Sequence, residues 1–266
     1  MKINIGFLGD IVGRSGRNFV KENISKIKNN YNLQLLIANA ENASGGTGLG
    51  AKEAIELKNA GIDLITLGDH SFSNNTILNF LNSSENNFCV TPCNYKDNKA
   101  TREYISYRIG DANIVIFSLL GKVFLTREVT CPFVKAKEIV DKINSEVKNN
   151  IILLDFHAEA TSEKLAMGYY LDSKISALLG THTHVQTSDA KILNNGLGYI
   201  TDAGMCGPRD GVIGMDISYS LDRLMGKREK GYKLSVGKNQ INGVVLEVET
   251  ESKKTINIEY FQIVEE

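Results

Sequence analysis

The 266-residue chain has no tryptophan, only three prolines and only four cysteines. The cysteines form no C-x-x-C pair and no zinc-finger spacing, which favours free thiols without a metal role. The N-terminal stretch MKINIGFLGDIVG has one lysine and a short apolar run interrupted by Asn4 and Asp10. This pattern is typical of neither a signal peptide nor a membrane-spanning helix, so we expect a cytoplasmic protein with no membrane partner.

A strong charge of either sign is also missing. The chain carries 30 basic and 31 acidic side chains, which gives a formal net charge of -1 at pH 7. Because no overall positive field attracts a phosphate backbone, we expect no stable nucleic-acid partner. Any nucleotide must be held by local contacts.

Hydrophobic residues make up 42% of the chain, enough for a sizeable core, and we predict a single domain over residues 1–266. Apolar runs alternate with helix-like segments, which is typical of an α/β fold whose strands are covered on both faces. The predicted strands are INIGFL, LQLLIANA, GIDLITL, NIVIFSLL, NIILLDF, ISALLG and LGYIT.

The predicted helices are Ser15–Asn29, Ala51–Asn59, Thr76–Leu81, Val134–Asn149 and Ser162–Leu171. The last of them begins near T-S-E-K, which indicates a capped start. The segments GVVLEVET and KTINIEYFQI flank a polar ESKK turn and predict an antiparallel hairpin. Residues 90–135 are mixed in polarity, and a small cap or lid could sit there.

All four histidines follow predicted strands. His182 and His184 stand in LLGTHTHVQ, where a period of two places them on the same side of a strand or its end. Alone, such a pair is more often two solvated loop residues, but other polar residues share the position. The full set at these strand ends is Asp10, Glu41, Asn42, Asp69, His70, His157, His182 and His184. Because the carboxyl ends of strands form the ligand-binding edge of open α/β sheets, we predict a metal site there.

Three carboxylates, one amide and four imidazoles exceed what a single catalytic zinc needs, so the set predicts two metal ions. Nitrogen and oxygen ligands without thiolate suit iron, manganese or zinc and do not single one out. Two such ions can share a bridging hydroxide and clamp a phosphoryl oxygen, which predicts hydrolysis of a phosphate ester. Either Glu41 or an aspartate would bridge the ions, because a carboxylate offers two oxygens. We assign His70 as the general acid, the alternative being that it only orients Asp69.

Two further features are weaker. Arg14 and Arg17 follow the first ligand, but arginines on helix surfaces usually face solvent, so we leave both outside the site. The stretch ENASGGTGLG lacks the G-K-[ST] ending of a P-loop and predicts a tight active-site loop. The stretch DAGMCGPRDGVIG has glycines that would let backbone N–H groups approach a ligand, although a simple turn would explain them equally well.

Taken together, these motifs resemble calcineurin-like metallophosphoesterases, and most closely their YmdB-like branch of cyclic nucleotide phosphodiesterases. The motifs that carry the resemblance are GFLGDIVGRSGR, NAENASGGTGL, GIDLITLGDHSFS, TPCNY, DFHAEATSEK, GTHTHVQT and TDAGMCGPRDGVIG. The resemblance implies a sandwich of two β-sheets flanked by helices, with a small cap region, and a homo-oligomer. It also implies two divalent or mixed-valence metal ions per chain.

The resemblance further implies a role for each site residue. One metal would be bound by Asp10, Glu41 and His184, and the other by Glu41, Asp69, His157 and His182, with Asn42 beside them. His70 matches the family's proton-donating histidine. The implied substrates are 2′,3′-cyclic nucleotides such as 2′,3′-cAMP. The alternatives are a phosphomonoesterase, such as a nucleotidase or protein phosphatase, and a nucleotide-sensing regulator with little turnover.

One ligand departs from the pattern. The family usually reads Gly-Asn-His where this chain has Gly68, Asp69 and His70. Asp69 still offers an oxygen ligand, but its negative charge partly neutralises the ions. We therefore expect tighter metal binding and weaker Lewis acidity than an asparagine would give.

Overall fold

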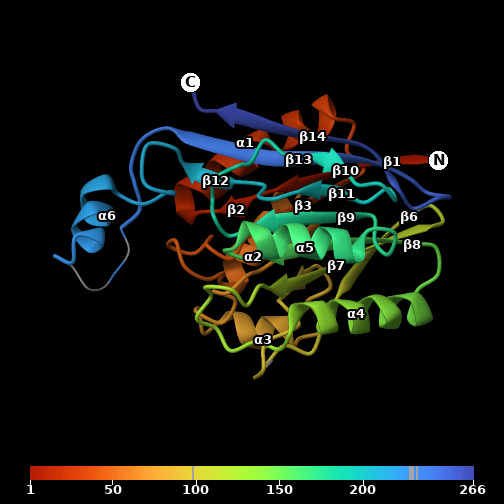
Figure 1. The fold of residues 1–266 in the computed structure, drawn as a ribbon. Coiled ribbons are helices and arrows are strands. Elements are labelled where there is room, and N and C mark those ends of the chain that lie inside the picture. Colours follow the sequence, from red (N-terminus) through yellow and green to blue (C-terminus); the bar gives the residue numbers. More distant parts are fainter. Residues whose placement is uncertain (98, 228–230, 232) are drawn as a thin grey trace.

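Two β-sheets pack face to face in the computed structural model, which describes residues 1–97, 99–227, 231 and 233–266 (Figure 1). Helices cover the outer face of each sheet. This architecture confirms the predicted α/β sandwich flanked by helices. None of the helices in the described ranges is both long and apolar enough to cross a membrane.

The first sheet has the order β2-β12-β13-β1-β3-β4-β5, with β14 paired to β13. Its strands are β1 (Lys2–Leu8), β2 (Asp10–Ile11), β3 (Leu35–Asn39), β4 (Leu64–Thr66), β5 (Cys89–Val90), β12 (Met205–Pro208), β13 (Asn239–Glu249) and β14 (Thr255–Val264). Strands β1, β3, β4 and β5 are parallel, whereas β13 runs antiparallel to β1 and to β14. The β13–β14 pair is the hairpin predicted around ESKK.

The second sheet has the order β10-β11-β9-β8-β7-β6. Its strands are β6 (Ile105–Ile109), β7 (Ala112–Leu120), β8 (Asn150–His157), β9 (Ala177–Thr181), β10 (Lys191–Ile192) and β11 (Gly198–Ile200). The four central strands are parallel, and the two edge strands are antiparallel to their neighbours. Residues 105–120 belong to the region where a cap could sit. In the structure they form the β6–β7 hairpin of this sheet.

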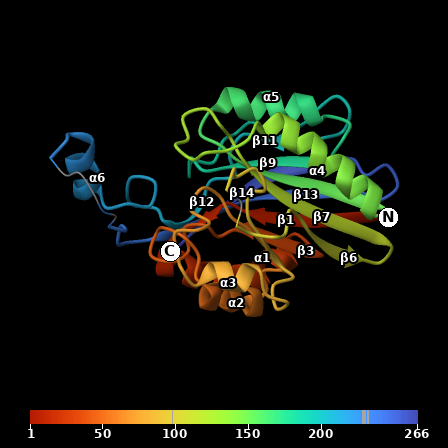
Figure 2. The ribbon, with the colours of Figure 1, turned by 90° about the horizontal axis from the view of Figure 1, so that it is seen from below.

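Helices lie on both sides of the sandwich. Figure 2 shows α4 (Pro132–Glu146) and α5 (Thr161–Leu171) on one side, and α1 (Gly13–Asn30), α2 (Ala51–Ala60) and α3 (Ile77–Leu81) on the other. The short helix α6 (Ile217–Leu224), which the sequence analysis did not predict, projects away from the sandwich. The five predicted helices correspond to α1–α5.

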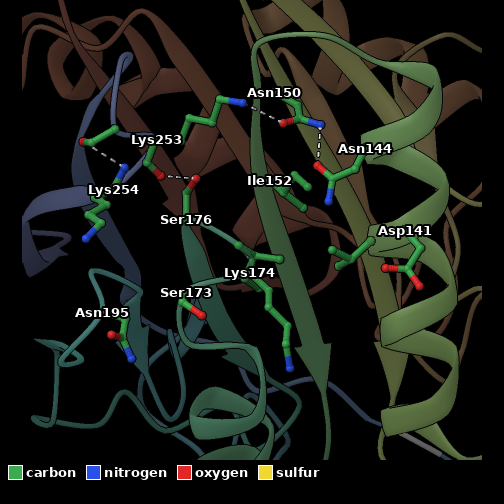
Figure 3. Close-up of a pocket in the computed structure, with 13 residues that line it drawn as sticks. Asp141, Asn144, Asn150, Ile152, Ser173, Lys174, Ser176, Asn195, Lys253 and Lys254 are labelled. Carbon is green, nitrogen blue, oxygen red and sulfur yellow. Dashed lines mark hydrogen bonds between the residues drawn. The ribbon is translucent and has the colours of Figure 1, made fainter.

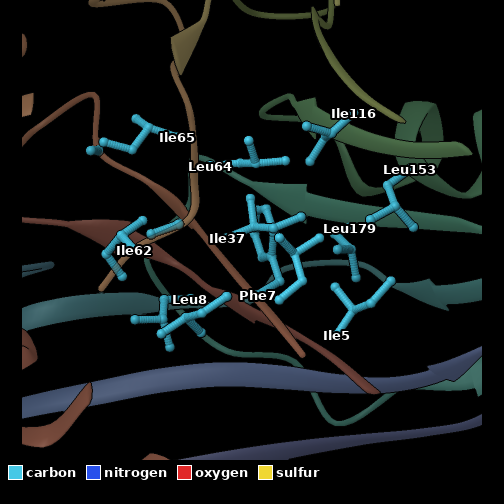
Figure 4. Close-up of a cluster of buried hydrophobic side chains, with 14 of the residues drawn as sticks. Ile5, Phe7, Leu8, Ile37, Ile62, Leu64, Ile65, Ile116, Leu153 and Leu179 are labelled. Atoms are coloured by element: carbon cyan, nitrogen blue, oxygen red, sulfur yellow. The ribbon is translucent and has the colours of Figure 1, made fainter. Parts of the chain in front are cut away.

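The hydrophobic core forms two layers because the second sheet is buried on both faces. Along β7, Ile114 and Ile116 contact the core between the sheets, while Val115 and Phe117 contact the core under α4 and α5. This alternation follows from the period of two in an extended strand. Figure 4 shows the inter-sheet layer, to which strands of both sheets contribute.

The capped start expected for the fifth helix is wrong. The residue before α5 is Ala160, and no side chain caps the helix. Instead the buried carboxylate of Glu163 accepts hydrogen bonds from the backbone N–H groups of Lys122 (2.9 Å) and Val123 (3.1 Å). Glu163 of the T-S-E-K stretch thus holds a neighbouring loop rather than the helix end.

A buried ion pair fixes the segment after β9. Lys164 and Asp202 are both fully buried, and the Lys164 ammonium donates to Asp202 Oδ2 (2.9 Å) and to the Thr181 carbonyl (2.7 Å). Asp202 Oδ2 also accepts from the backbone N–H (3.0 Å) and hydroxyl (2.8 Å) of Thr183. These bonds hold residues 181–184 in a turn where His182 (φ 99°) and His184 (φ 63°) adopt left-handed backbone.

We predict that Lys164→Met lowers the free energy of unfolding by about 3–5 kcal/mol, because it leaves Asp202 as an unpaired buried charge. Urea denaturation followed by circular dichroism measures this loss. The matched control is Lys137→Met, which removes an exposed pair with Asp141 and should leave stability nearly unchanged. Equal stability of the two variants would contradict the assigned role of the buried pair.

Candidate metal centre

The carboxyl ends of strands from both sheets meet at one point. Asp10 lies in β2 just after β1, Glu41 follows β3, and Asp69 follows β4. From the second sheet, His157 ends β8, and His182 follows β9. The structure therefore brings the residues predicted from strand ends into one cluster, as expected for the carboxyl edge of parallel strands.

The tightest part of the cluster contains Glu41, Asp69, His157 and His182. Each offers one ligand atom, and these atoms lie within 4.8 Å of one another. His157 Nε2 lies 3.3 Å from Glu41 Oε1 and 3.4 Å from Asp69 Oδ1. It also lies 2.9 Å from His182 Nδ1. These four residues are the set that the resemblance assigns to one metal.

Asp10, Asn42 and His184 lie beside this group. His184 Nε2 is 3.3 Å from Asn42 Oδ1 and 3.9 Å from Asp10 Oδ1. The other Asp10 oxygen accepts a hydrogen bond from the His182 backbone N–H (3.2 Å). All the predicted ligand residues are thus neighbours, in two adjoining groups.

Hydrogen bonds outside the cluster orient the histidines. The Thr181 hydroxyl donates to Asp155 (2.7 Å), so it accepts from His157 Nδ1 (2.9 Å) and leaves Nε2 facing the cluster. Similarly, Glu159 Oε2 lies 3.1 Å from His182 Nε2 and leaves Nδ1 facing the cluster. Each imidazole is held by one nitrogen and presents the other, which is how metal-binding histidines are oriented.

His184 completes the pattern and gives a test of fit. Its Nδ1 donates to the Ile213 carbonyl (3.0 Å), so the lone pair of Nε2 faces Asn42 Oδ1. The Asn42 amide nitrogen donates to the Gly46 carbonyl (3.2 Å), which keeps Oδ1 on the histidine side. Two acceptors facing each other are stabilised by a cation between them.

Two buried carboxylate oxygens give a second test. Among the described residues, Asp10 Oδ1 and Asp69 Oδ1 are buried without a hydrogen-bond partner. An unpaired buried carboxylate oxygen is costly unless a cation satisfies it. Together with the oriented imidazoles, these oxygens fit bound metal ions.

The pKa shifts show that the cluster stabilises positive charge. Burial alone would lower the pKa of His157, but Glu41, Asp69 and Asp10 together raise it well above its usual range. Burial lowers the pKa of His182 to about 4, so that imidazole is neutral at pH 7. Burial raises the pKa of Asp10 to about 7. Positive charge is therefore favoured where the ligand atoms converge.

His70 lies at the rim of the cluster. Its backbone N–H donates to Glu41 Oε2 (3.0 Å), and its side-chain Nε2 is 3.9 Å from Asp69 Oδ1. On its other side, His70 Nδ1 lies 3.5 Å from Arg127 Nη2. The imidazole is 22% exposed and lines the cavity over the cluster, so a ligand can reach it.

The glycine-rich stretch at 41–50 forms the loop after β3. Arg17, on α1, donates to the Ala43 carbonyl in this loop and lies 3.5 Å from Glu56 on α2. The prediction that both early arginines face solvent holds for Arg14 and is wrong for Arg17, which is only 7% exposed. Arg17 stabilises the loop that carries Glu41.

Four residues that support the site were not predicted from the sequence. Glu159 and Arg127 contact it from loops, and Lys164 and Asp202 support it from the interior. Glu159 and Arg127 stand in polar loop segments whose sequence does not differ from that of any exposed loop. The pairing of Lys164 on α5 with Asp202 after β11 is a tertiary contact, and no sequence pattern predicts it.

A cavity of about 260 Å³ opens over the cluster. It is lined by Glu41, Asn42, His70, Glu159, His182 and His184, with Val12, Ile213 and Met215 as apolar wall. A larger cavity of about 510 Å³ lies at the opposite end of β8 (Figure 3). Two of its lysines already have partners: Lys253 is directed to Asn150 (3.4 Å) and Lys174 to the Tyr170 carbonyl (2.6 Å). The smaller cavity is the one that carries reactive groups.

Comparison with known proteins shows the family to which the chain belongs. Residues 7–261 match the family described as YmdB-like protein. The chain is 38% identical over 257 residues to the 2′,3′-cyclic-nucleotide 2′-phosphodiesterase of Bacillus subtilis, covering 97% of this chain and 96% of that protein. It is 36% identical over 266 residues to a putative phosphatase/phosphodiesterase of Mycoplasma pneumoniae, covering 98% and 92%.

The fold is shared with a solved structure described as a novel phosphatase from Mycoplasma pneumoniae. The TM-score is 0.91 at 36% sequence identity, over 99% of this chain and 94% of that one. These matches extend over nearly the full chain, and all three proteins are described as phosphatases or phosphodiesterases. The chain therefore belongs to the YmdB-like protein family and is a hydrolase that acts on phosphoric esters.

Proposed function

We propose that the chain is a metal-dependent phosphodiesterase that hydrolyses 2′,3′-cyclic nucleotides at a dinuclear site. The convergence of oriented imidazoles and unpaired carboxylate oxygens at one cavity carries this proposal. The substrate class is supported by the relative from Bacillus subtilis, whose name specifies a 2′,3′-cyclic nucleotide. A cavity of about 260 Å³ also suits a small ligand rather than a polymer.

In this proposal the two adjoining groups hold two metal ions. Asp10, Glu41 and His184 bind one ion, and Glu41, Asp69, His157 and His182 bind the other. When bound, divalent ions such as Fe, Mn or Zn lower the pKa of water and polarise phosphoryl oxygens. Glu41 suits the shared position because one of its oxygens faces His157 and the other accepts from the His70 backbone.

The remaining residues bind the substrate and move protons. The oxygen of a water bonds to phosphorus while that water gives a proton to solvent, and one ribose oxygen leaves phosphorus and takes a proton, which gives a nucleoside monophosphate. His70, at the rim and partly exposed, supplies this proton. Asn42 lies beside the cluster, and the apolar wall of Val12, Ile213 and Met215 faces the nucleoside.

A phosphomonoesterase is the second candidate. The Mycoplasma pneumoniae relative is named for both phosphatase and phosphodiesterase, and two metal ions activate water for either ester class. A regulator with little turnover is the third candidate.

We also expect a cytoplasmic homo-oligomer without nucleic-acid or membrane partners.

The first test is hydrolysis of 2′,3′-cAMP by the purified protein with Mn²⁺ or Fe²⁺. We expect turnover that a chelator abolishes, and a loss of about two orders of magnitude or more in Glu41→Gln, because metal ions contribute several kcal/mol to the transition state. Exposed Glu251→Gln is the matched control and should keep full activity.

The two alternative functions are distinguished by other substrates and by a binding measurement. Faster hydrolysis of a mono-aryl than of a bis-aryl phosphate would favour the phosphomonoesterase. Absence of turnover with every metal, together with tight binding of 2′,3′-cAMP, would favour the regulator.

We predict that Asp69→Asn keeps metal ions and phosphodiesterase activity but changes the metal preference or the pH profile. An amide oxygen still coordinates, but it brings no negative charge to the ions. Elemental analysis together with activity measured across pH and metals tests this. Complete loss of metal from the variant would show that Asp69 needs its charge to bind.

A further inference from the structure

We propose that Arg127 contacts the phosphoryl group of the substrate, which makes it a catalytic residue. The inference rests on the proposed phosphodiesterase function. It follows from three observations: the anchoring of the loop at residues 121–131, the contacts of Arg127, and the lack of lysine and arginine among the described residues that line the cavity.

The loop that carries Arg127 is held at both ends. At its start, the Glu163 carboxylate accepts from the backbone of Lys122 and Val123. At its end, Val129 forms a β-bridge with Tyr95, and the Thr130 N–H donates to the Asn94 carbonyl (2.9 Å). Arg127 therefore projects from a segment with a defined position rather than from a free tip.

Arg127 reaches the rim of the metal centre. Its Nε lies 3.6 Å from Asp69 Oδ2, and its Nη2 lies 3.5 Å from His70 Nδ1. Both distances are longer than good hydrogen bonds, and the side chain is 41% exposed. Within the described chain, Arg127 Nη1 has no hydrogen-bond partner. The guanidinium thus keeps donors available for a ligand beside His70.

No lysine or arginine is among the described residues that line the cavity. Arg127 itself lies just outside this lining, against His70, which does line it. A phosphodiester is an anion, and negative charge increases on its oxygens as the water adds. A guanidinium stays charged at every relevant pH and presents donors in a fork that matches two phosphoryl oxygens. Arg127 supplies this group next to His70, the proposed proton donor to the leaving oxygen.

Arg127 has a rival role, which is to neutralise Asp69 without touching substrate. The two roles differ when Asp69 is replaced. If Arg127 binds the phosphoryl group, its loss has the same effect whether residue 69 is Asp or Asn. If it only neutralises Asp69, its loss has no effect once that charge is gone, so a double-mutant cycle separates the roles.

The experiment compares wild type, Arg127→Gln, Asp69→Asn and the double variant in kcat/KM for 2′,3′-cAMP. We expect Arg127→Gln to lower kcat/KM by about 100-fold in both backgrounds, as for loss of a donor to a developing negative charge. An effect below about 2-fold in the Asp69→Asn background would overturn the proposal. Should Asp69→Asn bind no metal, the variant Arg127→Lys is measured instead. A kcat/KM within about 2-fold of wild type would mean that only the positive charge matters, as for neutralisation of Asp69, and would overturn the proposal.

Calorimetric titration with inorganic phosphate gives a second measurement that needs no turnover. We expect Arg127→Gln to weaken phosphate binding to the metal-loaded protein by about 10-fold or more, with unchanged metal content by elemental analysis. Arg108→Gln is the matched control, because Arg108 is exposed on β6, where its guanidinium contacts only its sequence neighbours Asp111 (3.9 Å) and the Gly110 carbonyl (2.9 Å) among the described residues.

The two measurements also distinguish failure of this proposal from failure of the proposed function. A wild-type protein that hydrolyses no phosphodiester would overturn the proposed function, while phosphate binding would still report on Arg127. Unchanged phosphate binding in Arg127→Gln, or loss of metal from it, would overturn the role of Arg127.

Discussion

The structure depends on holding three carboxylates, Asp10, Glu41 and Asp69, close together at the edge of a hydrophobic core. Asp10 and Glu41 are buried, and the Asp69 side chain is only 12% exposed. Like charges this close repel one another in a medium of low dielectric, so the arrangement requires positive charge among them. His157 meets this requirement in the protein alone by taking up a proton, and bound cations would meet it more fully.

The polar residues beneath the cluster follow from the same requirement. The side chains of Asn39, Asp155 and Thr181 form a buried hydrogen-bonded series that ends at His157. Such a series is favourable in a core only when every member is satisfied, and then it fixes each side chain in one orientation. The histidine is therefore pre-oriented before any ligand arrives, which lowers the cost of binding.

The turn after β9 shows a similar balance between cost and orientation. Left-handed backbone at His182 and at His184 costs on the order of 1–3 kcal/mol each. The buried pair of Lys164 and Asp202 over-determines this turn, because Asp202 also binds both polar groups of Thr183. Strain at these two histidines is thus supported by bonds that lie outside the cluster.

Residue patterns along the chain were enough to predict helices α1–α5, the long central strands and the sheet edge that carries the polar cluster, but not α6 or short strands such as β12. Apolar runs bury both faces of a strand, and residues at strand ends meet at one sheet edge, so Asp10 and His157 could be placed together from pattern alone. The orientation of the imidazoles, the anchoring of a loop by Glu163 and the position of Arg127 beside Asp69 depend on tertiary packing. Those contacts join residues far apart in the chain, such as Asp69 and Arg127, which are separated by 58 in sequence number. Local periodicity carries no information about such distant contacts, because they are set by how the two sheets and their loops pack.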